Sequence, residues 1–305
     1  MRIVFMGTPD IAATCLTRLC EAGYCPVGVY TKPDSPKNRG MKLAKSEVKE
    51  AAEVWGLPVY QPASARTPEV YEELKALKPD LIAVVAYGKI LPQNILDIPP
   101  MGCINIHASI LPKLRGAGPV QWSILNGDRE TGVTGMYMDA GMDTGDIIEI
   151  RRTPIDPEEN AQSLLDRLAV MGAELLNELV CRLDKGETLP RTPQKHEEAT
   201  LAPMLTKALC PIDFTKPAQV ILNQIRGLDP WPVATAAFGN STFKIYRAVP
   251  TDTVSDAAPG TLLGLNKQGL QVVCGDKKVI TILTLQAQGG KRMDAAAYFR
   301  GHPLP

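Results

Sequence analysis

The sequence predicts an α/β protein: a doubly wound, mostly parallel sheet followed by a small antiparallel β-barrel. In the first part of the chain, short apolar runs alternate with helical segments, as in parallel sheets covered by helices. Beyond a polar, proline-containing stretch, the apolar runs become short and closely spaced, which is typical of a small barrel. The 305 residues suffice for two domains. We therefore expect a first domain at 1–185, a linker at 186–205 and a second domain at 206–305.

The first domain opens on the apolar run Ile3–Met6, after which Pro9 and Asp10 favour the start of a helix over 10–22. Apolar and β-branched runs predict the next strands at 27–31, 59–61, 80–86, 103–108 and 131–138. Helices are predicted at 46–55, where Ser46 can cap the first turn, and at 67–77, 118–126 and 160–184.

The second domain differs from the first in its pattern and in its charge. One helix is predicted at 217–227, and strands are predicted at 233–238, 242–248, 260–265, 269–274 and 279–285. Residues 206–305 contain seven lysines and four arginines against six aspartates and no glutamate, while the whole chain has no net charge. This excess of positive charge favours a polyanionic partner for the second domain, although an uneven scatter of solvated charges would give the same count.

Several classes of protein are excluded by composition and motifs. The opening run Met1–Gly7 is too short for a signal peptide or a membrane span. The seven cysteines are odd in number and scattered, so neither a disulfide framework nor a metal site is predicted. The turn Gly7-Thr8-Pro9 lacks the GxGxxG spacing, so a nicotinamide or flavin cofactor is not supported. We expect a reduced, cytoplasmic protein with buried thiols.

The residues best suited to chemistry follow the run that begins at Cys103. Asn105 and His107 are two residues apart, so both side chains leave the same face of a strand. Pro112 ends that strand, which places the pair near its carboxyl end, where ligands bind in open α/β sheets. The later turn 138–146 offers three carboxylates, and spacing alone does not choose among them. Each residue taken alone also has an ordinary structural explanation, such as a turn or a helix cap.

These motifs resemble those of the formyltransferases that use 10-formyltetrahydrofolate. The resemblance lies in the segment Asn105–Pro112, in Arg115-Gly116-Ala117, in Gly132-Val133-Thr134 and in Met138–Asp146. It runs nearly end to end and implies a Rossmann-like domain followed by an OB-like barrel. Four further segments resemble the members that formylate methionine on initiator tRNA, namely residues 7–9, 32–45, 223–232 and 291–301.

The resemblance implies a catalytic set and a reaction without a metal. The α-amine of methionine would attack the formyl carbon carried by the folate, and an anionic tetrahedral intermediate would form. Asn105 would donate a hydrogen bond to the oxyanion, and His107 would donate to it or move a proton. Asp143 would keep His107 charged and order a water molecule, and the choice of Asp143 over Asp139 and Asp146 rests on the resemblance.

The resemblance also implies residues for both substrates. For the folate they are Ser109, Ile110, Leu111 and Pro112. Residues 86–92 form another loop after a strand, where Gly88 allows close approach and the apolar walls suit a pterin ring, so Tyr87, Gly88 and Ile90 are further candidates, although this loop could be an ordinary strand-to-helix turn. For the tRNA they are Arg39, Lys42 and Lys45 in the basic loop 32–45, which could instead be a mobile surface loop, and Lys207, Arg226, Lys244, Arg247, Lys291 and Arg292 in the second domain.

Two other functions compete with transfer to initiator tRNA. The first is formylation of a small amine, either glycinamide ribonucleotide or an amino-sugar nucleotide, but such an acceptor needs neither the basic loop nor the basic second domain. The second is RNA binding without catalysis, against which the intact set of Asn105, His107 and Asp143 argues. No membrane and no stable protein partner is implied.

Overall fold

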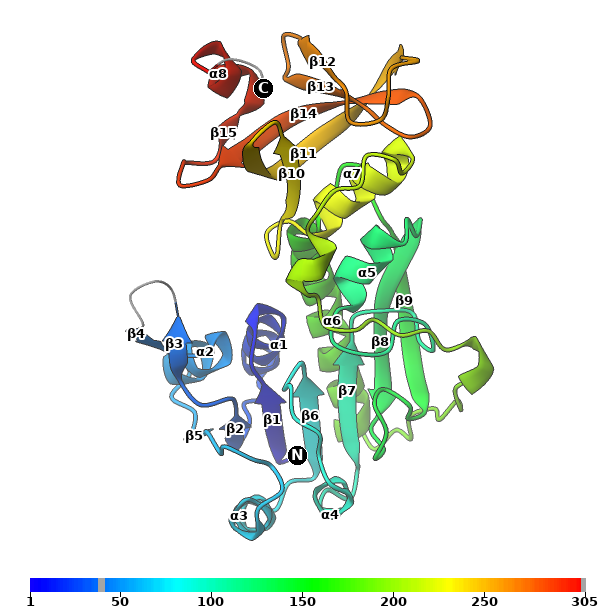
Figure 1. The fold of residues 1–305 in the computed structure, drawn as a ribbon. Helices are drawn as coiled ribbons and strands as arrows, with labels where there is room; N and C mark the ends of the chain where they lie inside the picture. The colour runs from blue at the N-terminus through cyan, green and yellow to red at the C-terminus, as the bar shows by residue number, and fades with distance from the viewer. Residues whose placement is uncertain (38–41, 303–305) are drawn as a thin grey trace. The chain divides into compact units, whose positions relative to one another are not determined.

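The computed structural model describes residues 1–37 and 42–302 of the chain (Figure 1). The chain divides into two compact units, each assembled from three segments. The N-terminal unit comprises Met1–Pro119, Glu130–Thr153 and Leu165–Pro203. The C-terminal unit comprises Val120–Arg129, Pro154–Leu164 and Met204–Pro305. Within the described residues, no helix combines the length and hydrophobicity needed to cross a membrane.

The N-terminal unit is built on a seven-stranded sheet in the order β5-β2-β1-β6-β7-β8-β9. The strands are β1 (Ile3–Gly7), β2 (Gly28–Tyr30), β5 (Val59–Tyr60), β6 (Leu81–Val85), β7 (Cys103–His107), β8 (Glu130–Tyr137) and β9 (Ile147–Pro154). The pairs from β5 to β7 are parallel, and β8 runs antiparallel to β7. The mostly parallel sheet that the sequence predicted is therefore confirmed.

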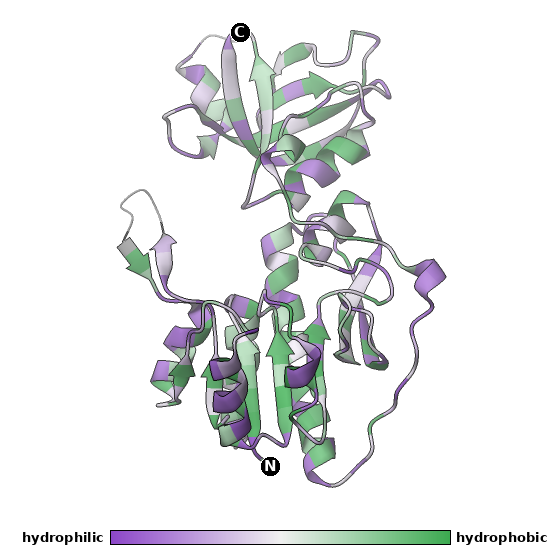
Figure 2. Ribbon diagram, turned by 60° about the horizontal axis from the view of Figure 1, so that its bottom comes forward, coloured by the Kyte–Doolittle hydropathy of each residue, from purple (hydrophilic) through white to green (hydrophobic). Residues whose placement is uncertain are grey.

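Helices cover both faces of this sheet, as its apolar strands require (Figure 2). They are α1 (Asp10–Glu21), α2 (Glu47–Val54), α3 (Pro68–Leu77), α4 (Gln93–Leu96) and the long α6 (Ala161–Asp184). Ser46 caps α2 by accepting a hydrogen bond from the backbone N–H of Lys49 at 3.1 Å. Val70 of α3 and Ile95 of α4 pack in one core with Cys103 of β7.

The opposite face of β7 and β8 packs closely on α6. A Cβ on Gly172 would lie 2.9 Å from Ile106, and one on Gly135 would lie 2.7 Å from Leu179. Glycine at both positions therefore allows the helix to approach the sheet. Since side chains alternate along a strand, Ile106 faces α6 while Asn105 and His107 face the other way, on the side of Cys103.

Three parts of the N-terminal unit were not predicted. Strand β9 escaped notice because its polar side chains interrupt the apolar run, and its burial is only partial. Helix α4 has only four residues. Within the expected loop 32–45, Ser35–Lys37 (β3) pairs antiparallel with Lys42–Ala44 (β4), and this hairpin projects from the sheet (Figure 1).

The C-terminal unit is an antiparallel sheet in the order β10-β11-β14-β13-β12, with β15 paired to β14. Its elements are α7 (Ala218–Gly227), β10 (Ala234–Phe238), β11 (Ser241–Val254), β12 (Leu262–Leu265), β13 (Leu270–Val273), β14 (Lys278–Ala287), β15 (Met293–Asp294) and α8 (Ala295–Arg300). Strand β11 extends further than predicted because shifts in its register with β14 accommodate polar stretches. The predicted antiparallel character is confirmed, whereas β15 and α8 were not predicted.

A separate apolar core stabilises the C-terminal unit. Ile221 and Ile225 of α7 pack with strand residues such as Phe243 and Ile282. Trp122 lies against this core as well, from helix α5 (Pro119–Leu125), which comes much earlier in the chain. The expectation of buried thiols is right for five cysteines and wrong for Cys25, which is exposed; Cys181 is half-buried.

Candidate active site

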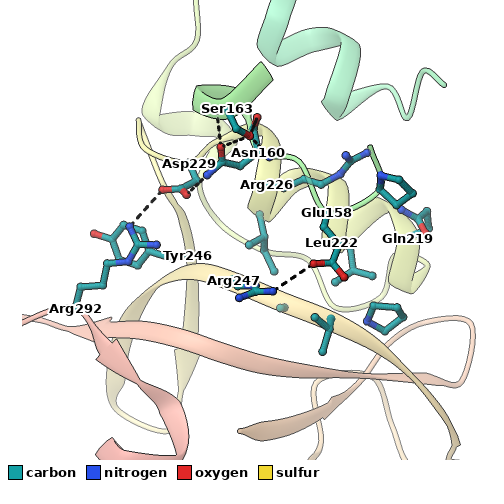
Figure 3. A pocket seen from close by; sticks show the side chains of 15 residues that line it. Glu158, Asn160, Ser163, Gln219, Leu222, Arg226, Asp229, Tyr246, Arg247 and Arg292 are labelled. Carbon is teal, nitrogen blue, oxygen red and sulfur yellow. Dashed lines mark hydrogen bonds and ion pairs between the residues drawn. The ribbon is translucent and has the colours of Figure 1, made fainter. Parts of the chain in front are cut away.

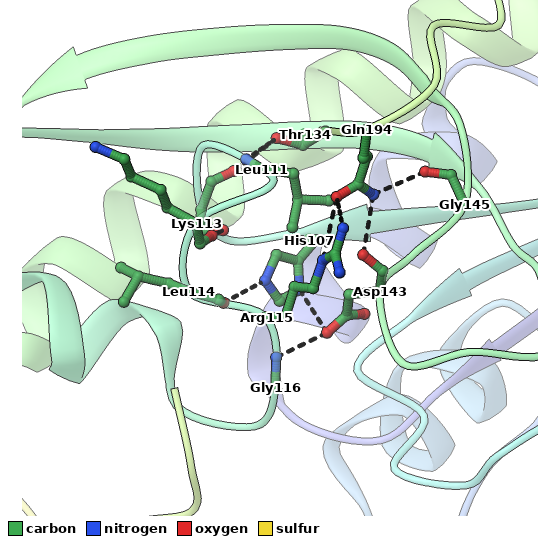
Figure 4. A network of polar contacts seen from close by, with 11 residues as sticks. His107, Leu111, Lys113, Leu114, Arg115, Gly116, Thr134, Asp143, Gly145 and Gln194 are labelled. Atoms are coloured by element: carbon green, nitrogen blue, oxygen red, sulfur yellow. Dashed lines mark hydrogen bonds and ion pairs between the residues drawn. The ribbon is translucent and has the colours of Figure 1, made fainter. Parts of the chain in front are cut away.

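His107 is the last residue of β7, and its imidazole lies between two oxygen atoms (Figure 4). Its Nε2 is 2.9 Å from the backbone carbonyl oxygen of Leu114. Because a carbonyl only accepts, Nε2 carries a hydrogen and donates it. On the other side, Nδ1 lies 3.7 Å from Oδ2 of Asp143. With 6% of its surface exposed, the residue is held in place by protein rather than by solvent.

Asp143 lies in the turn between β8 and β9, where its backbone adopts a positive φ of 55°. Its Oδ2 accepts a hydrogen bond from the backbone N–H of Gly116 at 2.8 Å. Its two acidic neighbours are used elsewhere: Asp139 accepts from Gly141 and Thr144 of its own turn, and Asp146 lies 3.9 Å from Arg191. Of the three carboxylates that spacing left open, the structure therefore brings Asp143 to His107.

Asn105 lies two residues before His107 on the same face of β7, and 8% of its surface is exposed. Within the described part of the chain, no group forms a hydrogen bond with its amide side chain. The amide is thus available to donate to a bound oxygen atom. Together, these residues offer a neutral donor, a ring whose doubly protonated form can donate at either nitrogen, and a carboxylate beside that ring.

A polar network surrounds this set, and sequence reasoning did not assign it to the site (Figure 4). Thr134 of β8 donates to the carbonyl of Ser109 at 2.6 Å and accepts from the N–H of Leu111 at 3.2 Å, which fixes the loop after β7. Gln194 donates to the carbonyls of Asp143 and Gly145 and accepts from Arg115. Gln194 lies in the stretch that we expected to be a linker, and no motif distinguished it.

Two family models match the chain: Formyl transferase over residues 1–180, and Formyl transferase, C-terminal domain, over residues 204–303. The chain belongs to the formyl transferase family. The two matched regions fall on either side of the segment that contains Gln194.

Similar proteins extend this membership over the full length. The methionyl-tRNA formyltransferase of Trichlorobacter lovleyi is 48% identical to this chain over 305 residues, covering 99% of the chain and 95% of that protein. The methionyl-tRNA formyltransferase of Clostridioides difficile is 44% identical over 304 residues, covering 100% and 98%. An N-formyltransferase from Helicobacter canadensis, crystallised with folinic acid and dTDP-3-aminofucose, has a TM-score of 0.70 at 20% identity, covering 92% of this chain and 98% of its own, so it shares the fold.

The residues that the sequence suggested for folate form two loops after neighbouring strands. In the loop after β7, Ser109 and Leu111 are buried, and Ser109 donates to the carbonyl of Lys113 at 2.7 Å. Ile110 and Pro112 are half-buried, so they are the accessible residues of that loop. In the loop after β6, Tyr87 is buried, and burial raises the pKa of its hydroxyl to about 12, while Gly88 and Ile90 are exposed.

The residues suggested for tRNA in the C-terminal unit differ in their exposure and in the hydrogen bonds that they already form. Lys207, Lys244 and Lys291 are exposed. Arg226 is half-buried, and its guanidinium donates to the side-chain oxygen of Asn223 and to the carbonyls of Asp156 and Glu159. Burial lowers the pKa of Arg226. This arginine therefore holds parts of its own unit together, and its predicted role toward tRNA stays a prediction.

Arg226, Arg247 and Arg292 line one cavity of about 570 Å³ within the C-terminal unit (Figure 3). Arg247 lies 3.3 Å from Glu158. Arg292 covers the ring of Tyr246 at 4.2 Å and lies 3.8 Å from Asp229. The Arg247–Glu158 pair is exposed and therefore weak, so the guanidinium of Arg247 can turn toward a phosphate at little cost. Arg292 faces a buried carboxylate, so its contact with Asp229 is costly to break.

The basic segment 32–45 contains one acidic residue, Asp34, which anchors the base of the hairpin formed by β3 and β4. Asp34 accepts hydrogen bonds from Lys49 and from Gln61, both at 2.7 Å, and these two contacts lower the pKa of its carboxyl. Lys45 is exposed and pairs with Glu53. Arg39 and the side chain of Lys42 lie outside the described residues. Among the residues that are described, no group of three or more His, Cys, Asp or Glu side chains could hold a metal ion.

Proposed function

We propose that this protein transfers the formyl group of 10-formyltetrahydrofolate to the α-amino group of methionine carried by initiator tRNA. The observation that carries the proposal is the meeting of His107 and Asp143 on the face of β7 that also presents the unoccupied amide of Asn105. Membership of the formyl transferase family supports the reaction class. Full-length identity of 44–48% to methionyl-tRNA formyltransferases supports the acceptor.

The residues at the site match the needs of acyl transfer to an amine. When the amine attacks the formyl carbon, the carbonyl oxygen becomes negative, and the free amide of Asn105 can donate to it. The attacking nitrogen must lose a proton, and N10 of the folate must gain one as its bond to the formyl carbon breaks. His107 would donate to the oxyanion or pass that proton by exchanging its contact with Leu114 or with Asp143.

We assign the two substrates to different parts of the chain. Residues 1–185 would form the catalytic domain, with the folate against the loops at 87–90 and 109–112. Residues 206–305 would bind the tRNA backbone, with the stretch 186–205 as the linker, and the loop 32–45 would contact the acceptor end of the tRNA. Such an enzyme acts where initiator tRNA is charged, so we also propose a cytoplasmic location.

A competition assay tests the proposal. Purified protein and 10-formyltetrahydrofolate are offered methionyl-initiator tRNA, uncharged tRNA, glycinamide ribonucleotide and an amino-sugar nucleotide in separate reactions. We expect formyl transfer to the charged tRNA alone. Transfer to a small amine, with none to charged tRNA, would overturn the assigned acceptor while leaving the reaction class intact. Binding of tRNA without any transfer would overturn the enzyme itself.

A further inference from the structure

The buried amide of Gln194 uses its full hydrogen-bonding capacity beside the active site. Its Nε2 donates to the backbone carbonyls of Asp143, at 2.9 Å, and Gly145, at 2.7 Å. Its Oε1 accepts from Nε of Arg115 at 3.2 Å and from Nη2 at 2.7 Å. Two donors and two lone pairs are all that an amide has, so none is left for solvent. Only 6% of the residue is exposed.

These contacts join the two chain segments that must meet for Asp143 to reach His107. The carboxylate of Asp143 accepts from the N–H of Gly116, the residue that follows Arg115. Gln194 therefore provides a second link between the same two segments, because it bonds to the backbone of Asp143 and to the side chain of Arg115. The neighbouring residues of its own segment are fixed on both sides, because Thr192 pairs with Ile147 and Leu201 pairs with Arg115.

Gln194 adds two backbone contacts, at Asp143 and Gly145, to a turn that is also held on either side of Asp143. The carboxylate of Asp139 accepts from the N–H of Gly141 and from the hydroxyl of Thr144, and the carbonyl of Asp146 accepts from the N–H of Tyr137 at 2.9 Å. Asp143 lies between these points in a left-handed conformation that non-glycine residues seldom adopt. A backbone clamp at this residue is what such a conformation requires to persist.

We propose that Gln194 is a positioning residue for formyl transfer, which fixes the Asp143 carboxylate against His107. This inference rests on the proposed function. Displacement of a catalytic group by about 1 Å can lower a rate roughly 100-fold, so a clamp on the backbone of Asp143 acts on the chemical step. Gln194 touches neither substrate in this proposal, and its effect passes through Asp143.

The variant Gln194→Glu tests the clamp with almost no change in shape. A carboxylate can still accept from Arg115, but it cannot donate to the carbonyls of Asp143 and Gly145. We expect kcat to fall by roughly 10- to 100-fold, with the KM for folate and for charged tRNA each within about twofold of the parent. Gln194→Met, which lacks both functions and adds no charge, should show the same loss in kcat.

A double-mutant cycle distinguishes positioning from a general structural role. In an Asp143→Asn background, measured by single-turnover formylation, Gln194→Glu should cause less than about a twofold further loss, because the group it positions is already gone. Gln224→Glu is the matched control: the side-chain amide of Gln224 also donates to backbone carbonyls, those of Leu209, Cys210 and Pro211, but in the C-terminal unit. This control should lower the unfolding midpoint and leave kcat unchanged.

Three results would overturn the inference. They are an unchanged kcat in Gln194→Glu, full additivity of its loss with that of Asp143→Asn, and an equal fall of kcat in Gln224→Glu. Failure of the proposed function is a separate observation, because the parent protein would then not formylate methionyl-tRNA at all. In that case the same cycle is run on whichever amine the parent formylates, and the three results keep their meaning.

Discussion

The Nδ1 atom of His107 lies 3.7 Å from Oδ2 of Asp143, while Nε2 of the same ring donates to the carbonyl of Leu114 at 2.9 Å. The second contact fixes the plane of the ring and leaves Nδ1 facing the carboxylate. Both nitrogens therefore face acceptors, and a ring protonated at both positions satisfies both.

The variant His107→Ala should abolish most of the catalysis without affecting the binding of tRNA. General acid–base and electrostatic groups of this kind contribute roughly 10²- to 10⁴-fold, so kcat should fall by at least about 100-fold. Filter binding with charged tRNA should give a Kd within about twofold of the parent. His302→Ala is the control, because His302 is exposed and, among the described residues, its ring contacts the carbonyl and the ring of Tyr298, in the C-terminal unit. A parent-like kcat in His107→Ala would contradict the site.

The variant Asn105→Ala should remove a donor to the oxyanion. Loss of one such donor typically lowers kcat by roughly 10²- to 10³-fold. Because the amide has no partner within the described part of the chain, its removal leaves no other group unsatisfied, and the unfolding midpoint should hardly change. Asn105→Asp keeps the shape but cannot donate, so its loss should be at least as large. Wild-type rates in Asn105→Asp would show that the amide does not donate to the transition state.

Binding of tRNA should weaken steeply as salt increases, and single exposed lysines should account for separate parts of the slope. Replacing Lys244 or Lys291 by Gln should reduce the slope of log Kd against log salt concentration by about 1 each, if each contacts one phosphate. The measurement is a salt titration with charged tRNA. Slopes identical to the parent in both variants would remove the C-terminal unit from the tRNA interface.

The variant Arg39→Ala should raise the KM for charged tRNA and leave the Kd for folate unchanged. Arg39 is a sequence-based choice from the basic segment 32–45 and lies outside the described residues. Lys45→Ala provides a comparison from the same hairpin, because Lys45 is already paired with Glu53. We expect a larger change in KM for Arg39→Ala than for Lys45→Ala, and the opposite order would shift the contact to the base of the hairpin.

The thiols should divide sharply in reactivity. Burial raises the pKa of Cys15 and of Cys103 to about 12, so at pH 8 only roughly one in 10⁴ of these thiols is ionised. Cys25 is exposed. Mass spectrometry after brief iodoacetamide treatment at pH 8 should find Cys25 modified and Cys15 and Cys103 intact until the protein is unfolded. Early modification of Cys103 would contradict its burial in the core that it shares with Val70 and Ile95.

The sequence was most informative where a short-range pattern coincides with the chemistry. Asn105 and His107 could be paired from their spacing because a strand places alternate residues on one face. Asp143 could not be chosen from spacing, since its approach depends on a turn fixed from outside itself. Gln194 could not be found at all, because an isolated glutamine in a polar stretch has no signature until the chain brings it to Arg115 and Asp143.

The same contrast holds for the fold. The central strands and the long helix α6 were predicted because buried, periodic apolar residues specify them. Strand β9 lies at the edge of the sheet beside β8, and β3 and β4 pair with each other in a separate two-stranded sheet, so none of the three needs a long apolar run. From the sequence, Arg226 was grouped with the exposed cations. Its hydrogen bonds to Asn223, Asp156 and Glu159 show that it instead stabilises the C-terminal unit. The number of charged residues can be read from a sequence, but the residues that pair with them can be identified only in the structure.

The segmented composition of the two units limits how this protein can be dissected. Residues 120–129 and 154–164 belong to the C-terminal unit, and residues 186–203 belong to the N-terminal one. A fragment that ends at residue 185 would lack Gln194 and the backbone pairing between Leu201 and Arg115. An isolated fragment 206–305 would lack Trp122, whose indole packs against the core of the C-terminal unit. No single scission releases either unit whole, so proteolytic nicking between them should leave pieces that are less soluble than the parent.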